Sequence, residues 1–592
     1  MQAMGSDMGG KKTRMPRGSS CLNCRRRRIK CDALRPTCSN CERSLGKFYD
    51  CEYGDGGPPQ AEYLQEQISI MESRVRELED PSQPLDSMVL HNPYGGFPAR
   101  ASPAAPSVPR GSRSIELSPQ LRKVLLSTFF RHAPQLGFFL DNTRLFNSAS
   151  GSPITQSALS PALLQTILLL GAHLSSYSRA TSGSSGTQND SLEGLRATLL
   201  SKAINSTSQI LSSNHPDKVL QAIQTHVLLT HYFYMNGRKL EGRYHLSMAV
   251  SLVISTRMHR TRSRDELGSS DSLRIQVAGL PGPANFASQN LQEPRHEKER
   301  IDAFWTVLSM NSCWTTLEGT VSSLMYRTPQ MRVDTPWPGV PLSPDTRSSS
   351  TIEWFLANVP DGDYSMLALH AKASILFEQA FTLEEFDANA SMESIQTRSQ
   401  SYNSLCTLVQ RFQSELPPIV GTSANSAVGS VDSTQIGQLL LIRTLICVGK
   451  IRLAALSPPT PYTYTYGTTV LPDSPRQIAL EVVELIRNVH SIFISNFTWD
   501  VDKEMFFVDP ILAVLWTMVG QTLAQDVERI ETGTIGVELP RQARITQLDE
   551  LRRGLDTIIR AMSIFGAASR PLLDQQLQIL LAGRGSGGDR GA

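Results

Sequence analysis

Six of the chain's nine cysteines lie in one short stretch, CLNCRRRRIKCDALRPTCSNCERSLGKFYDC, which spans residues 21–51. A segment this short and polar cannot bury a hydrophobic core of its own, so it needs covalent or metal cross-links to fold. Its intervals of two, six, six, two and nine residues separate Cys21, Cys24, Cys31, Cys38, Cys41 and Cys51. These sulfur atoms therefore constrain the fold of the stretch more than any other feature.

The pattern favours metal over disulfides. The first twenty residues hold no continuous apolar run, so we expect no secretory signal and reduced thiols. Each C-x2-C pair lets a turn present two thiolates to a tetrahedral zinc ion, and the stretch has no histidine to share that task. Six sulfurs serve two four-coordinate ions if two of them bridge, so we predict two Zn²⁺. Ordinary buried cysteines or a redox motif are the alternatives, and they explain the paired spacing less well.

Positive charge is concentrated beside this sulfur. The chain as a whole is nearly neutral, with 57 basic and 55 acidic residues, yet residues 11–30 hold nine basic residues and no acidic one. Such a block suits a phosphate backbone or an import receptor. We therefore expect double-stranded DNA as a partner, bound by the run between the second and third cysteines: Arg25, Arg26, Arg27, Arg28 and Lys30. A zinc module with a purely structural role is the alternative, and the basic run argues against it.

The stretch resembles the DNA-binding module of the fungal zinc binuclear cluster transcription factors, the six-cysteine family. The resemblance rests on C-x2-C-RRRRIK-CD, on Pro36 before the second C-x2-C, and on the aromatic Tyr53 after the last cysteine. It implies that the first and fourth cysteines, Cys21 and Cys38, bridge the two metals while the other four are terminal ligands. The final interval of nine residues is slightly longer than is usual in the family.

The resemblance also implies how DNA is read. In the family a short helix follows the second cysteine and enters the major groove of a CGG-type half-site, and the base contacts come from positions that correspond to Arg27 and Arg28. Successive helical residues are about 100° apart, so four adjacent arginines cannot share one face, and some must meet phosphates instead. Arg28 stands where the family commonly has lysine, and its planar fork suits guanine O6 and N7.

A heptad pattern follows a short linker, residues 54–60, that is rich in glycine and proline. Over residues 61–79 the pattern predicts a short coiled-coil dimerisation helix, with Arg74 and Glu79 placed for a bridge between two copies in a homodimer. The alternative is an amphipathic helix that docks on its own domain. The seam positions are Ala61, Leu64, Ile68, Met71, Val75 and Leu78.

The rest of the chain is predicted to be mainly α-helical. Apolar residues recur at intervals of three and four from 119 to 580, and the one clear alternating, strand-like pattern is at 462–470. Two segments, GRYHLSMAVSLVISTRMHR (242–260) and EKERIDAFWTVLSMNSCWTTLEG (297–319), resemble the regulatory domain of the same family, although Ile301 replaces an expected arginine. We expect a disordered arm (1–20), a disordered linker (80–118) and a disordered tail (581–592).

Catalytic motifs are missing from the sequence. HEKER at 296–300 lacks the second histidine of a zinc protease helix, and there is no phosphate loop, dinucleotide fingerprint or nucleophile elbow. No apolar run approaches the roughly 20 residues of a membrane span, so we expect no membrane partner. A ligand pocket among the helices is compatible with the sequence, which does not locate one. His259, Arg260, Phe304 and Trp305 are predicted to pack between helices.

These patterns predict a small zinc binuclear cluster module at 21–53, a short coiled coil, and a large all-helical regulatory domain at 119–580. The predicted function is sequence-specific transcription regulation of RNA polymerase II genes in the nucleus, without enzymatic activity, with an import receptor and the transcription machinery as further partners. One rival is a zinc-stapled protein-interaction module whose basic run serves nuclear import alone. A second rival is an enzyme in the helical region that carries a DNA-targeting module.

Overall fold

The computed structural model describes residues 20–34, 37–43, 51, 117–150, 159–180, 187–261, 294–328, 331–339, 350–362, 365–383, 391–419, 433–456, 474–496, 507–535, 540–565 and 569–585. The chain divides into two compact units, residues 1–111 and 112–592. The predicted dimerisation helix at 61–79, the strand-like pattern at 462–470 and most of the predicted arm, linker and tail lie outside the described residues.

The first unit is built on two very short helices, α1 (Leu22–Arg26) and α2 (Ser39–Glu42). Each helix carries one C-x2-C motif and has little apolar surface to bury. Helices of one turn are not stable alone in water, so their conformation depends on what joins them. The joining groups are the cysteine sulfur atoms described in the next subsection.

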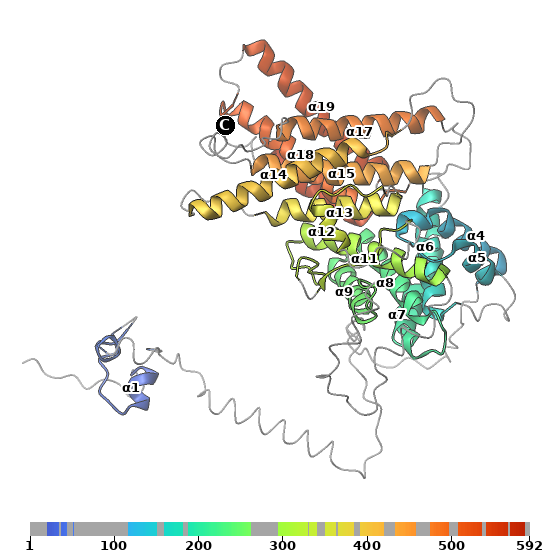
Figure 1. Ribbon diagram of the computed structural model, residues 1–592, viewed down its shortest axis with the longest axis horizontal. Helices are drawn as coiled ribbons and strands as arrows, with labels where there is room; N and C mark the ends of the chain where they lie inside the picture. The colour runs from blue at the N-terminus through green and yellow to red at the C-terminus, as the bar shows by residue number, and fades with distance from the viewer. Residues whose placement is uncertain are drawn as a thin grey trace, which may run out of the picture. The chain divides into compact units, whose positions relative to one another are not determined.

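The second unit is helical, and its described residues contain no strand, which confirms the predicted mainly α class. Figure 1 shows α13, α14, α15, α17 and α18 side by side in one part of the unit, with α6, α7, α8, α9 and α11 in the other. In chain order the helices are α4 (Pro119–His132), η1 (Ala133–Leu136), α5 (Asn142–Ser150), α6 (Pro161–Ala180), α7 (Thr187–Thr207), η3 (Ile210–Ser212), α8 (Lys218–Met235), α9 (Lys239–Ser255), α11 (Pro294–Leu317), α12 (Thr351–Leu356), α13 (Met366–Thr382), α14 (Met392–Glu415), α15 (Ser433–Ala455), α17 (Pro475–Asn496), α18 (Ile511–Glu531), α19 (Arg541–Phe565) and α20 (Arg570–Gly585).

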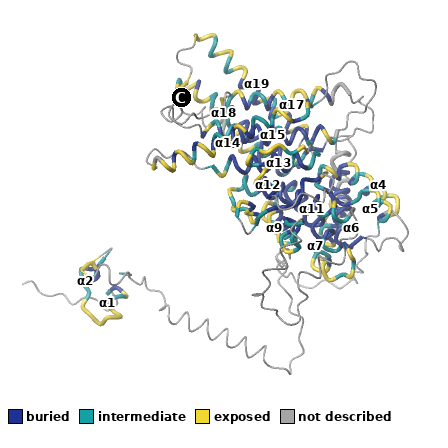
Figure 2. The backbone as a smooth tube through the Cα atoms, in the orientation of Figure 1, coloured by how far each residue is buried: buried dark blue, intermediate teal, exposed yellow. Residues whose placement is uncertain are grey.

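One hydrophobic core runs through both parts of this unit, from α4 to α20. Figure 2 shows buried residues concentrated in α8, α11, α13 and α15, which are covered by other helices. Because these central helices are buried on several sides, their sequences are apolar around most of the helix rather than along one stripe. No helix among the described residues is long and apolar enough to cross a membrane.

The two segments that resemble the family's regulatory domain fall on α9 and α11, and their small and aromatic residues have clear packing roles. A side chain at Gly242 would begin 3.1 Å from the Tyr234 ring, so glycine lets α9 approach α8 closely. Gly319 ends α11 in the left-handed region, where glycine is favoured. Phe304 and Trp305 are fully buried, as predicted. Ile301 is also buried, and an unpaired arginine there would be costly.

The sequence of the acidic segment 377–387 is compatible with an activation segment or with a helix of the folded domain. Its first part belongs to α13, which continues to Thr382, and Phe377 is fully buried in the core. Residues 384–387 lie outside the described part of the chain. The helical reading is therefore confirmed for residues 377–382.

A pair of glycines offers a test of how closely these helices pack. Gly171 in α6 faces the α4 backbone, and a Cβ atom there would stand 2.8 Å from the carbonyl carbon of Leu125 and closer still to its oxygen. Gly171→Ala should therefore destabilise the protein by about 1–3 kcal/mol, because backbone cannot move aside as a flexible side chain can. Gly194 in α7 has open space around it, so Gly194→Ala should stabilise by up to about 1 kcal/mol through helix propensity.

The measurement is urea denaturation of the full chain followed by far-ultraviolet circular dichroism, with Gly194→Ala as the matched control. The two substitutions should shift the unfolding midpoint in opposite directions. Equal shifts would show that α4 and α6 do not pack as closely as described.

Candidate metal centre

Both short helices begin at a cysteine. Cys21 is the N-cap of α1, and its sulfur accepts a hydrogen bond from the Cys24 N–H at 3.3 Å. Cys38 is the N-cap of α2, and its own N–H donates to the Cys51 sulfur at 3.2 Å. A cysteine at the cap and another three residues later place both sulfur atoms of a C-x2-C motif at the same helix end. The two helices present their pairs to each other.

The six sulfur atoms form two overlapping groups of four. Within each group all the sulfur atoms lie within 4.8 Å of one another, and Cys21 and Cys38 belong to both groups. One group is Cys21, Cys24, Cys31 and Cys38, and the other is Cys21, Cys38, Cys41 and Cys51. The structure therefore brings together all six predicted ligands, including Cys51 after its longer interval.

The spacing within the groups fits a tetrahedral metal. Sulfur ligands about 2.3 Å from zinc stand about 3.8 Å apart along each edge of the tetrahedron. The Cys21 and Cys38 sulfur atoms are 3.7 Å apart, and those of Cys24 and Cys38 are 3.6 Å apart. All nine cysteines are free, so no disulfide accounts for this crowding. A donor set made only of sulfur is the kind that binds zinc in structural sites.

The electrostatics of the cluster also favour a cation. Burial raises the pKa of Cys21 well above its usual range and that of Cys24 to about 12. Burial acts the same way on Cys38, but interactions with the Cys41 backbone and with the neighbouring thiols leave the Cys38 pKa below its usual value. Metal ligands must be thiolates, so a bound dication would have to supply the charge that keeps these buried sulfur atoms deprotonated.

Polar side chains link the two halves of the module. Asn23 donates from Nδ2 to the Cys41 sulfur at 3.5 Å, and Asn40 donates from Nδ2 to the Lys30 carbonyl at 2.6 Å. Both oxygens of Asp32 accept from the Ser39 N–H at 3.2 Å. Hydrogen bonding with Ser39, through its side chain first and its N–H second, lowers the pKa of the Asp32 carboxyl. These four residues are not among the site residues predicted from the sequence. The available signal was the repeated C-x-N-C, which places Asn23 and Asn40 at equivalent positions.

The basic run is arranged differently from the expectation. We expected a helix that follows the second cysteine, but α1 begins before Cys24 and ends at Arg26, because the C-x2-C motif itself forms the first turn. Arg27 is the C-cap, and Arg28 has φ of 53°, in the left-handed region. Arg27 and Arg28 therefore lie beyond the last helical residue, so the 100° spacing of helical side chains does not describe where they point.

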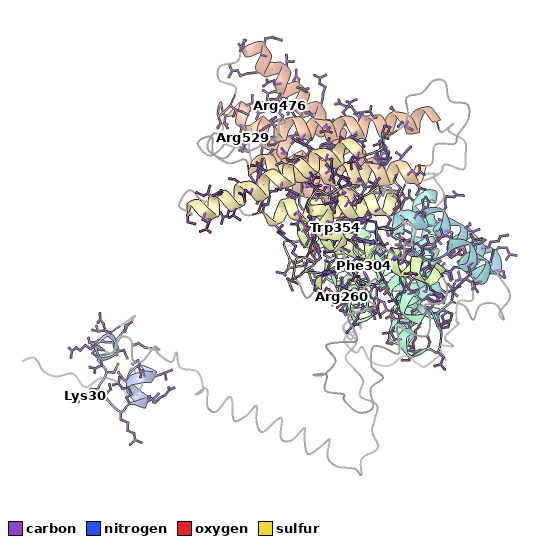
Figure 3. The ribbon with its side chains drawn as sticks, viewed as in Figure 1. Lys30, Arg260, Phe304, Trp354, Arg476 and Arg529 are labelled. Carbon is purple, nitrogen blue, oxygen red and sulfur yellow. The ribbon has the colours of Figure 1, made fainter. Side chains whose placement is uncertain are left out.

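Arg28 ends the helix with a recognisable geometry. The N–H of the next residue, Ile29, donates to the Cys24 carbonyl at 3.1 Å, which closes the turn around Arg28. Glycine is usual at this position, and a residue with a side chain is strained there by about 1–2 kcal/mol. Arg25, Arg26, Arg27, Arg28 and Lys30 are all exposed, and Figure 3 shows the Lys30 side chain extending out from the module. A rigid sulfur cluster thus carries a solvent-facing basic surface.

Comparison with known proteins gives independent evidence. Residues 19–56 match the model of the fungal Zn(2)-Cys(6) binuclear cluster domain, and residues 126–338 match that of the fungal specific transcription factor domain. A curated relative, the tropolone cluster transcription factor tropK of Talaromyces stipitatus, is 59% identical over 34 residues, which is 6% of this chain and 6% of the relative. No solved structure matches the chain.

The two matched domains occur in the order that the sequence predicts, with the cysteine module first. The match to the cluster domain implies zinc binding through the cysteines, and the match to the second domain agrees with the regulatory domain that the sequence resembles. Both matched domains, at residues 19–56 and 126–338, are those of the fungal zinc binuclear cluster transcription factor family that the sequence resembles.

Proposed function

We propose that this protein is a nuclear regulator of RNA polymerase II genes that binds CGG-type half-sites in the DNA major groove, as a homodimer, through a module holding two zinc ions. The observation that carries the proposal is the exposed run Arg25–Lys30, which starts inside the helix that the sulfur cluster fixes. Nuclear import receptors and the transcription machinery are the further partners that such a role requires. The family resemblance supports the nuclear location.

Two zinc ions fit the sulfur geometry because the two groups of four share Cys21 and Cys38. These two sulfurs would bridge the ions, while Cys24, Cys31, Cys41 and Cys51 would each bind one. When bound, the metal supplies the cross-links that replace a hydrophobic core. The role of the chain is to present six sulfur atoms at this spacing and to orient two of them by hydrogen bonds from Asn23 and the Cys38 N–H.

The arginines divide into two roles. Arg25 and Arg26 lie on the last turn of α1, whereas Arg28 stands in a left-handed turn that points the chain in a new direction. A side chain fixed by such a turn suits the contact that specifies sequence, because a bidentate Arg–guanine pair demands defined geometry. The neighbouring arginines are suited to phosphates, which fix the register of the protein on DNA.

Random-sequence selection with the zinc-loaded protein tests this division. The wild type should enrich a guanine-containing triplet, with a binding constant that falls steeply as salt rises. Arg28→Ala should cost about 1–3 kcal/mol on the selected site and relax the preference at one base pair. Arg43→Ala is the matched control: this exposed arginine follows α2, the other short helix, and its loss should weaken binding evenly across sequences, if at all.

The same selection separates the proposal from its main alternative. A zinc-stapled protein-interaction module with a nuclear-import segment would enrich no motif. Binding that is insensitive to salt or to metal removal would also contradict the proposed function.

The shared sulfurs give a second prediction, on metal content. Cys38→Ser should abolish binding of both zinc ions, because Cys38 belongs to both groups of four, whereas Cys51→Ser should leave one group complete and retain one ion. Native mass spectrometry of the purified full chain counts the ions, with two expected for the wild type. Equal losses in the two variants would rule out Cys38 as a bridging ligand.

Dimerisation is proposed from the heptad pattern at 61–79, which lies outside the described residues. Ile68→Lys would put a charge in the seam, and Ser69→Lys would put the same charge one position away, on the outer face. Sedimentation equilibrium at micromolar concentration should show a monomer for Ile68→Lys and a dimer for both the wild type and Ser69→Lys. A dimer that survives Ile68→Lys would place the interface elsewhere.

A further inference from the structure

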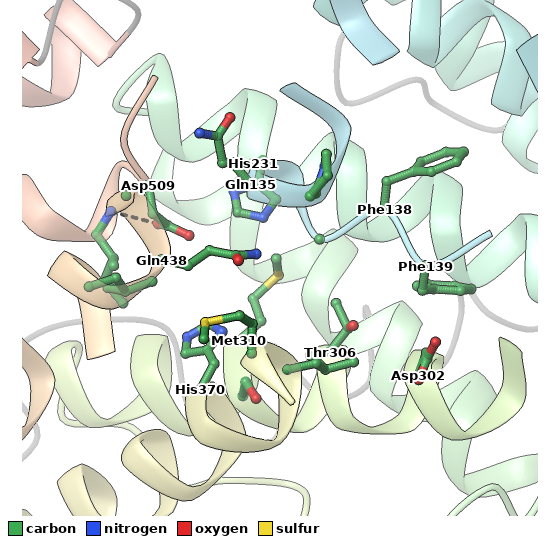
Figure 4. A pocket seen from close by; sticks show the side chains of 18 of the residues that line it. Gln135, Phe138, Phe139, His231, Asp302, Thr306, Met310, His370, Gln438 and Asp509 are labelled. Atoms are coloured by element: carbon green, nitrogen blue, oxygen red, sulfur yellow. Dashed lines mark hydrogen bonds between the residues drawn. The ribbon is translucent and has the colours of Figure 1, made fainter. Parts of the chain in front are cut away.

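A cavity with a volume of about 390 Å³ lies inside the helical unit (Figure 4). Its walls come from segments far apart in the sequence: the turn after η1, one residue of α8, the middle of α11, the start of α13, the start of α15 and the residues before α18. This volume is within the range of small-molecule sites, which are usually largely preformed. The cavity has no part in the metal centre, which belongs to the other unit.

One end of the cavity has an apolar wall beside a carboxyl group. Figure 4 shows Phe138 and Phe139 at this apolar end, with Asp302 and Thr306 next to them and Met310 deeper inside. Trp314 and Phe507 also line the wall. Flat aromatic faces and a polarisable thioether favour a ring system over a flexible polar chain. The apolar end therefore selects for an occupant with an aromatic or alicyclic body.

The other end brings polar side chains from four segments together. His231 of α8 is 3% exposed, and its Nδ1 makes no hydrogen bond within the described structure. His370 of α13, Gln438 of α15 and Asp509 before α18 lie near it in Figure 4. One oxygen of Asp509 accepts from the Ile511 N–H at 3.0 Å. Because this Nδ1 has almost no accessible surface, an occupant of the cavity would hydrogen-bond to the other polar atoms at this end.

Burial sets the charge state of this polar end. It lowers the pKa of His231 to about 4 and also lowers that of His370, so both imidazoles are neutral near pH 7. It raises the pKa of Asp509 to about 6. Neutral imidazoles both donate and accept hydrogen bonds. The end is therefore suited to a hydroxyl or carbonyl group.

Other kinds of occupant fit less well. The only sets of three or more metal-ligating side chains that converge in the described chain are the two cysteine groups, so His231, His370 and Asp509 do not form a metal site. An anion would meet the Asp509 carboxyl, and the one basic residue among the lining residues, Lys298, is 68% exposed and pairs with Asp302 at 2.5 Å.

We propose that this cavity binds a small uncharged organic molecule that has a ring body and at least one hydroxyl or carbonyl oxygen, and that this molecule is an effector of the regulator. The ring lies against Phe138 and Phe139, and the oxygen bonds to His231, His370, Gln438 or Asp509. Such a molecule contacts α8 and α11, which belong to the matched family domain. It also contacts α13, α15 and the segment before α18, which follow that domain in the sequence. Binding therefore stabilises the packing of these two regions, independently of how DNA is read.

Four related probes test the chemistry on the full zinc-loaded chain: 2-naphthol, naphthalene, 2-naphthoate and 2-naphthylmethylammonium. Isothermal titration should show saturable binding of 2-naphthol, at least tenfold weaker binding of the other three, and a rise in Tm with 2-naphthol concentration. Tighter binding of either charged probe would overturn the proposed class of ligand. Absence of saturable 2-naphthol binding up to millimolar concentration would overturn the site.

Two variants test the location. Gln438→Leu keeps the size of a side chain at the polar end but removes its hydrogen bonds, and Asp509→Asn keeps an oxygen that can cap the start of α18. Each should weaken 2-naphthol binding about tenfold while the Tm without probe stays within a few degrees. Gln435→Leu, an exposed site on the first turn of α15, is the matched control and should bind as the wild type does. Unchanged affinity in both pocket variants would contradict the assignment.

Discussion

The crowding of six sulfur atoms is the constraint on which the first unit depends. Two one-turn helices have almost no apolar surface to bury, and hydrogen bonds between exposed groups add only about 1 kcal/mol each. Their arrangement holds because two overlapping tetrahedra of sulfur share the Cys21–Cys38 edge, 3.7 Å long. Cys21 and Cys38 are also the N-caps of the two helices, so a metal bound to them would fix the start of both helices.

Much of this unit could be predicted from the sequence, because its constraints are local. The C-x2-C motif brings its two sulfur atoms close within one turn, and the intervals place the remaining ligands within reach. The end of α1 could not be predicted from helical periodicity alone. Periodicity assigns Arg28 to a helix, whereas the Ile29 N–H bonds to the Cys24 carbonyl and turns the chain at Arg28 into a left-handed conformation. That choice depends on where the third cysteine must go to reach the cluster.

Less of the helical unit could be predicted from the sequence. Its class and the packing of Phe304 and Trp305 follow from apolar spacing and aromatic content, which each helix carries by itself. The cavity could not be predicted in this way, because its polar end is assembled from four segments that are far apart in the sequence. His231, His370 and Asp509 each look like an ordinary buried polar residue in the sequence. Only the packing of α8 beside α11, and of α11 beside α13, brings them to one space.

Burial has different consequences in the two units. Around the cysteines it raises the pKa of Cys21 and Cys24, a cost that a bound dication would offset. Around the cavity it neutralises His231 and raises the pKa of Asp509, which leaves polar groups that an uncharged molecule can satisfy. The first arrangement suits a permanent scaffold for DNA contact. The second suits a site that is filled or empty according to the supply of ligand, because the surrounding core stays packed in either case.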